Sequence, residues 1–166
     1  MTDIEEIRKQ VAALYEPFAD VGREVSLALR AREYTFLAGD YIAAASIIER
    51  EGPHHWLPML QLTGQAVELA LKACLAASDH APPIGHDLVS LVRQAQARGF
   101  VLDSSMCAAI VHLQHFYFQD LATGTKYKAR YPSTKVECLG GAVPSNSTFT
   151  KIVTVLLDQA KQRTGA

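Results

Sequence analysis

Residues 56–77 read WLPMLQLTGQAVELALKACLAA, a long apolar segment with few polar residues inside it. Four of these polar residues are spaced so that, at about 3.6 residues per turn, they share one narrow face of a helix. They are Gln61, Gln65, Glu68 and Lys72. Apolar residues surround this polar stripe on nearly every side, which is typical of a helix at the centre of a bundle. The stripe is either a thin strip of solvent contact or a set of polar groups directed at partners inside the fold.

Helical patterns along the rest of the chain predict an all-α, antiparallel up-and-down helical bundle, because the connections are short and no strand alternation competes with them. A first helix is expected over 3–17, where Asp3 is the N-cap. Two further patterns cover 20–37 and 41–48, and we interpret Gly39-Asp40 between them as a break. We therefore expect a four-helix core with extra N-terminal helices.

Signals for helix ends continue in the second half of the chain. Asp87 precedes a short helix closed by Gly99, and Asp103 caps the next one. Asn146 or Ser147 is expected to cap a final helix. Before it, the stretch 122–146 is rich in Gly, Thr, Pro and Ser, which predicts a long functional loop, with or without a small hairpin.

Length and composition favour a single ordinary domain over residues 1–166. Apolar residues make up 49% of the chain and charged residues 20%, as in typical soluble proteins. The longest apolar stretches carry Gln, Glu or Lys, so we expect no contact with a membrane. The acidic start MTDIEE lacks the basic and apolar regions of a signal peptide, and a cytoplasmic location is therefore expected.

Cysteine and histidine spacings predict neither a metal site nor any other cofactor. The cysteines are far apart and form no C-x-x-C pair, which argues against a disulfide framework and a thiolate zinc site. They are Cys74, Cys107 and Cys138, and we expect small buried hydrophobes. The histidine pairs lack a third ligand at suitable spacing. These pairs are His54-His55 and His112/His115.

Charge points to one local candidate for contact with a polyanion, because the formal net charge of −1 gives no overall attraction. Residues 126–135 read KYKARYPSTK, with four cations and no acid. Arg130 suits bidentate phosphate contact, and Tyr127 and Tyr131 offer faces on which bases can stack. The alternatives are a solvated basic loop, or an Arg130 bonded to Glu68 inside the fold.

A second candidate is GHDL at 85–88, which places an ionisable ring at a helix start with Asp87 as a good N-cap. Glu68 and Lys72 form an i,i+4 pair, which is either an ordinary ion pair or part of a partly desolvated pocket with His86. In that pocket Glu68 would orient the imidazole and Lys72 would hold a phosphate. His86 is then an acid/base or phosphate-binding group, or otherwise a structural contact of the loop.

Three pieces in this order resemble the HEPN superfamily (higher eukaryotes and prokaryotes nucleotide-binding): GQAVELALKACL at 64–75, GHDL at 85–88 and RYP at 130–132. The resemblance covers roughly residues 40–160. It implies a helical bundle that commonly dimerises, so a homodimer is expected. It also implies a place in toxin–antitoxin or defence systems, where many members are metal-independent ribonucleases.

The chain departs from the R-x4-6-H motif of those ribonucleases. No histidine follows Arg130, since the last one is His115. Arg50 and His55 fit the spacing, but about one such match is expected by chance and this one straddles Gly52-Pro53. We therefore identify a variant without the ribonuclease motif, in which the expected fold is unchanged.

Two functions follow from these residues. The first is RNA or nucleotide binding in a groove lined by Lys72, His86, Tyr127, Arg130 and Tyr131, with Glu68 and Asp87 in orienting roles. If the domain is a degenerate or noncanonical ribonuclease, Arg130 would stabilise the developing charge and His86 would transfer protons. The second is a non-catalytic interaction module that pairs with a nucleotidyltransferase-type partner. In this module the polar stripe and Arg130 would form contacts inside the fold.

Overall fold

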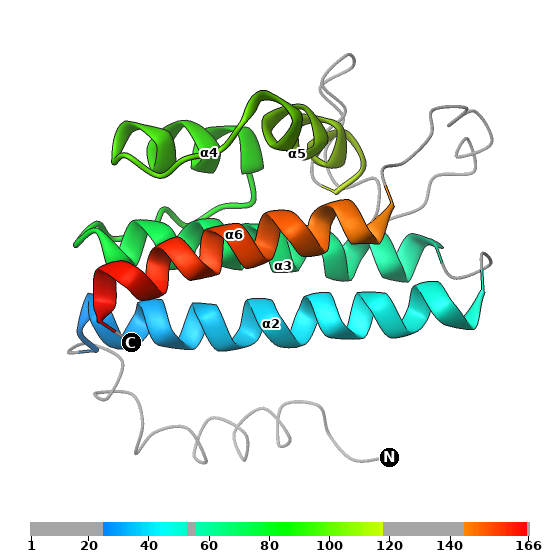
Figure 1. Cartoon of the computed structure of the whole chain (residues 1–166), viewed down its shortest axis with the longest axis horizontal. Coiled ribbons are helices and arrows are strands. Elements are labelled where there is room, and N and C mark those ends of the chain that lie inside the picture. Colours follow the sequence, from blue (N-terminus) through cyan, green and yellow to red (C-terminus); the bar gives the residue numbers. More distant parts are fainter. Residues whose placement is uncertain (1–24, 53–55, 118–144, 166) are drawn as a thin grey trace, which may run out of the picture.

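The computed structural model describes residues 25–52, 56–117 and 145–165, and every regular element in these ranges is an α-helix (Figure 1). The helices are α2 (Leu27–Glu51), α3 (Trp56–Ala77), α4 (Leu88–Ala97), α5 (Ser104–Tyr117) and α6 (Asn146–Thr164). The predicted all-α bundle is confirmed. The helix expected over 3–17 and the loop or hairpin expected before α6 lie outside the described residues.

Helix α3 lies at the centre of the bundle. It contacts each of the other four described helices, whereas α2 contacts only α3 and α6. Figure 1 shows α2 along one side of α3 and α6, with α4 and α5 on the other side. Thirteen of the 22 residues of α3 are buried, so the central position that its apolar sequence predicted is the one observed.

The expected break at Gly39-Asp40 is wrong, because α2 runs without interruption from Leu27 to Glu51. A glycine inside a helix costs only about 1 kcal/mol relative to alanine. On the inner face of α2, Ala38 is 0% exposed and Ile42 is 8% exposed, and both belong to the common core. Packing of this continuous face against the bundle outweighs the weak local preference for a break.

Two of the predicted caps are observed as expected. The side chain of Asp87 accepts a hydrogen bond from the backbone N–H of Ser90 at 3.0 Å and so caps α4. Asp103 Oδ1 accepts from the Ser105 hydroxyl at 2.6 Å and from the Met106 N–H at 2.8 Å. These bonds hold the pKa of the exposed Asp103 carboxyl below its ordinary value, with the Ser105 bond contributing most.

The N-cap of α6 is Ser145, one residue before the predicted position. Asn146 is instead 1% exposed, and its side chain joins three helices. Its amide donates to Ser46 Oγ of α2 at 2.8 Å and its oxygen accepts from Thr63 Oγ1 of α3 at 3.1 Å. This buried bridge fixes the start of α6 against the central helix.

Cys74 is fully buried in α3, in agreement with its expected role as a small hydrophobe. Burial raises the pKa of its thiol to about 12, so the side chain stays neutral and unreactive. Cys107 is only half-buried, and Cys138 lies outside the described residues. None of the helices in the described part of the chain is long and apolar enough to cross a bilayer.

Candidate functional site

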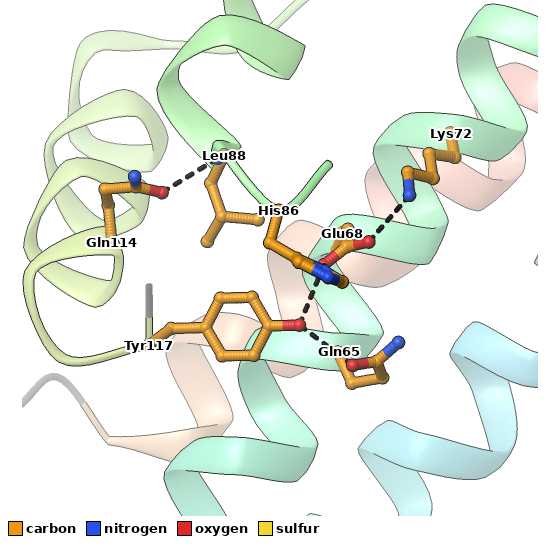
Figure 2. A network of polar contacts seen from close by, with 7 residues as sticks. All are labelled: Gln65, Glu68, Lys72, His86, Leu88, Gln114 and Tyr117. Atoms are coloured by element: carbon orange, nitrogen blue, oxygen red, sulfur yellow. Dashed lines mark hydrogen bonds and ion pairs between the residues drawn. The ribbon is translucent and has the colours of Figure 1, made fainter. Parts of the chain in front are cut away.

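Glu68 is the member of the polar stripe of α3 whose side chain points into the fold, and it is only 1% exposed. Its Oε1 accepts a hydrogen bond from Lys72 Nζ at 2.7 Å. Its Oε2 lies 2.8 Å from His86 Nδ1 and 2.7 Å from the Tyr117 hydroxyl (Figure 2). A buried carboxylate is tolerated where donors occupy its lone pairs, and here three side chains do so. At this position the stripe is directed at partners inside the fold.

His86 is held by the buried carboxylate but reaches the surface. An ionised carboxylate can only accept, so Nδ1 carries the proton, and in the neutral ring the lone pair is on Nε2. The imidazole side chain is 33% exposed, compared with 2% for the Glu68 side chain. Its ring also meets Tyr117 edge-on, with 6.5 Å between centroids. The arrangement presents a partly exposed imidazole with a fixed tautomer, which is suited to proton transfer or to contact with an anion.

Lys72 was expected to hold a phosphate. Its side chain is 13% exposed and its ammonium is paired with Glu68 at 2.7 Å. The two charges cancel, so attraction of phosphate to this surface depends on further cations. The pair differs from the exposed ion pair that the i,i+4 spacing also allowed, because the carboxylate is desolvated.

Tyr117 belongs to the site, although its place in the sequence did not reveal this. Tyr117 is 1% exposed, and its hydroxyl lies 2.8 Å from Gln65 Oε1 as well as close to Glu68. The ring packs directly over the backbone of Gly64, where any Cβ would collide with it. A glycine one turn before Glu68, in a helix with no other glycine, was the sequence signal for this close approach.

Gln114 is the second site residue that the sequence did not reveal. It is 1% exposed, and its Oε1 accepts from the Leu88 N–H at 2.8 Å. This bond ties α5 to the first residue of α4 (Figure 2), while Asp87 caps the same helix end. The loop that carries His86 is therefore held at two points, by Glu68 at the His86 ring and by Gln114 at the backbone of Leu88.

Three of the predicted binding residues, Tyr127, Arg130 and Tyr131, lie outside the described residues, and so does the alternative contact between Arg130 and Glu68. His55 lies outside them as well, whereas Arg50 is exposed in the last turn of α2. Within 25–52, 56–117 and 145–165, no three His, Cys, Asp or Glu side chains come together as they would around a metal ion.

Replacement of Gly64 tests the close packing that positions Tyr117. Gly64→Ala is expected to lower the free energy of unfolding by about 1–3 kcal/mol, because the added methyl group displaces the ring from Glu68. Gly39→Ala is the matched control. It also lies inside a helix, but a Cβ there meets nothing within 4 Å, so a change of zero to about 1 kcal/mol in favour of the folded state is expected.

Urea unfolding of both variants at sub-micromolar protein measures the two changes. A Gly64→Ala variant as stable as Gly39→Ala would show that the ring does not depend on this contact.

A comparison with known protein families matches residues 31–156 to the HEPN domain. Searches of curated proteins and of solved structures found no match. The matched range includes α3, α4 and α5 in full, and with them Glu68, His86, Gln114 and Tyr117. It covers well over half of the chain, and the observed helical bundle agrees with it. The chain therefore belongs to the HEPN family.

Proposed function

We propose that this HEPN domain binds RNA or a nucleotide at the surface around His86. The observation that carries the proposal is an imidazole with 33% side-chain exposure, held on a buried carboxylate by a 2.8 Å contact. A surface imidazole without a role does not require a desolvated glutamate behind it. Membership of the HEPN family supports the same conclusion, because the functions of HEPN domains generally involve RNA or nucleotides.

The basic segment 126–135 supplies the cations in this proposal. The last described residue of α5 is Tyr117, next to His86, and Lys126 follows it by nine residues. Nine residues span at most about 30 Å when fully extended, so this length of chain allows the segment to reach the surface around His86. In the proposed complex Arg130 contacts a phosphate, and Tyr127 and Tyr131 stack on bases.

A second candidate function is a non-catalytic module that pairs with another protein. It is favoured by the hydrogen bonds that Glu68 accepts from Lys72 and Tyr117 inside the fold. In this alternative the contacts of Glu68 with Lys72, His86 and Tyr117 only hold α3, α5 and the loop before α4 together. Binding measurements separate the two functions.

Fluorescence anisotropy with a labelled single-stranded RNA tests the first function. His86→Ala and Arg130→Ala are each expected to weaken binding about tenfold, the loss of one contact, while the helical circular dichroism signal stays unchanged. The logarithm of affinity should fall with the logarithm of salt concentration with a slope of about −2 to −3, since each phosphate contact contributes about −0.7.

The same samples with EDTA, run on a denaturing gel, test cleavage without metal.

His80→Ala is the matched control, because His80 is the other histidine of the loop between α3 and α4. It is expected to bind as tightly as the wild type. If the wild type shows no salt-sensitive binding of RNA or nucleotide, the interaction module takes precedence. If His86→Ala and Arg130→Ala both lose helicity, these side chains hold the loop rather than a ligand.

A further inference from the structure

The outward face of α2 exposes two large hydrophobic side chains on one line. Leu29 is 54% exposed and Phe36 is 69% exposed. They are seven residues apart, which puts them within about 20° of each other around the helix. Among the described helices, α2 contacts only α3 and α6, and Figure 1 shows it at the edge of the bundle. An apolar row of this kind indicates a surface that another segment covers.

A groove adjoins Phe36 where α2 meets α6, and its volume is about 440 Å³. Its lining includes Gly39 and the buried Leu157, with the exposed Lys161 beside them. A Cβ at Gly39 would meet nothing within 4 Å, so the helix surface is open there. The groove therefore has room for an aliphatic side chain from a segment that packs along α2.

The part of the chain before α2 contains a segment able to cover this face. The helix expected over 3–17 carries four apolar residues on one side, namely Ile4, Ile7, Val11 and Leu14. A helix of about this length is only marginally stable alone in water, so it needs a surface on which to pack. Only residues 18–25 separate it from Ser26, the N-cap of α2. A short connection favours antiparallel neighbours.

We propose that residues 3–17 form a helix that packs antiparallel on the outward face of α2 of the same chain. With Leu14 opposite Leu29, Ile7 lies opposite Phe36, because both pairs of residues are seven apart. Each of the two exposed side chains of the row then meets an apolar partner. Burial of these contacts stabilises both the segment and the exposed face of α2.

The remaining apolar residues of the segment also fit this register. Ile4 lies opposite Gly39, where the groove has room for it. Val11 lies opposite Arg32, whose aliphatic stem can pack on it while the charged group stays in water. Ile47 lies beyond the end of the proposed helix, and a single exposed hydrophobic side chain of this kind is ordinary on a protein surface.

Charges on the two helices favour the antiparallel direction. In this direction Arg8 lies on the same side of the contact as Glu33 and Asp40, and Asp3 lies on the side of α6, near Lys161. Glu33, Asp40 and Lys161 are exposed and form no ion pair with another described residue. A parallel helix would exchange the two sides and bring like charges together, which is unfavourable.

Hydrogen exchange of the full chain, followed by peptide mass spectrometry, tests the packed helix. Amides of residues 7–14 should exchange at least about tenfold faster in Phe36→Glu than in the wild type, because a helix this short loses its protection once it leaves the surface. Val101→Glu is the control. Val101 is 72% exposed between α4 and α5, and its replacement should leave this exchange unchanged.

Concentration separates contact within one chain from contact between copies. Protection of residues 7–14 should be the same at about 1 μM and about 100 μM protein, because an intramolecular contact does not depend on mass action. The proposal concerns α2 alone and does not depend on ligand binding at His86, so the two can fail separately.

The register is tested by placing charges at residues 7 and 36. Ile7→Lys/Phe36→Glu puts opposite charges face to face, whereas Ile7→Glu/Phe36→Glu puts like charges there. Residues 8–14 should exchange about threefold more slowly in the first double variant than in the second. Exchange of the α3 amides, measured in the same experiment, confirms that the bundle of each variant is folded.

Four results would overturn the proposal. Residues 7–14 that exchange at the rate of an unstructured peptide in the wild type form no packed helix. Protection that survives Phe36→Glu comes from a different surface. Protection that rises with concentration shows that a second copy covers the face instead. Equal exchange in the two double variants contradicts the pairing of residues 7 and 36.

Discussion

Leu71→Asp is expected to unfold the domain at 25 °C. Leu71 is 0% exposed, near the middle of α3, the helix that contacts all four other described helices. The substitution removes a packed side chain and places a carboxylate where no donor awaits it, which costs several kcal/mol. Small domains are stable by only about 5–15 kcal/mol. Loss of the cooperative thermal transition in circular dichroism checks the prediction.

Two control variants test whether the buried position of Leu71, rather than the presence of any substitution, causes the loss of stability. Val101→Asp introduces the same charge at a side chain that is 72% exposed, and should change stability by no more than about 0.5 kcal/mol. Gln61→Ala trims the edge of the polar stripe, where Oε1 of Gln61 has no hydrogen-bond partner among the described residues. If Gln61→Ala costs as much as Leu71→Asp, the polar stripe has been placed on the wrong side of α3.

The bounds of α3 could be predicted because its signals are local. An apolar run with one polar line needs only helical periodicity to be recognised. Asp87 and Asp103 were likewise recognisable as caps from a single residue type before an apolar pattern. At Gly39 the local signal was misleading, since the buried face of α2 continues on both sides of the glycine and tertiary packing decided the outcome.

The site could be predicted only in part, because its contacts join residues that are distant in sequence. Glu68, Lys72 and His86 were recognised as ionisable groups in a suitable order, and the structure brings these three together. Tyr117 follows Glu68 by 49 residues, and its hydroxyl could not be assigned without knowing how α5 packs on α3. Gln114 was hidden for the same reason, since nothing in its own helix shows that it accepts from Leu88.

Glu68→Ala is expected to destabilise the domain by about 3–5 kcal/mol, the typical effect of removing one partner from a buried ion pair. The substitution leaves the Lys72 ammonium, the His86 ring and the Tyr117 hydroxyl without their common acceptor. Glu51→Ala is the control, because Glu51 is exposed at the end of α2 and its loss should stay within about 0.5 kcal/mol. Urea unfolding measures both.

A double-mutant cycle identifies the buried charge as the cause. Glu68→Gln keeps the shape of the side chain but strands the Lys72 charge, so it should be destabilising on its own. Lys72→Met removes that charge, and in the Glu68→Gln background it should recover part of the loss, with a coupling of about 0.5–3 kcal/mol. Additive effects, together with a Glu68→Ala variant as stable as Glu51→Ala, would mean that solvent screens the pair and that no buried carboxylate holds His86 in place.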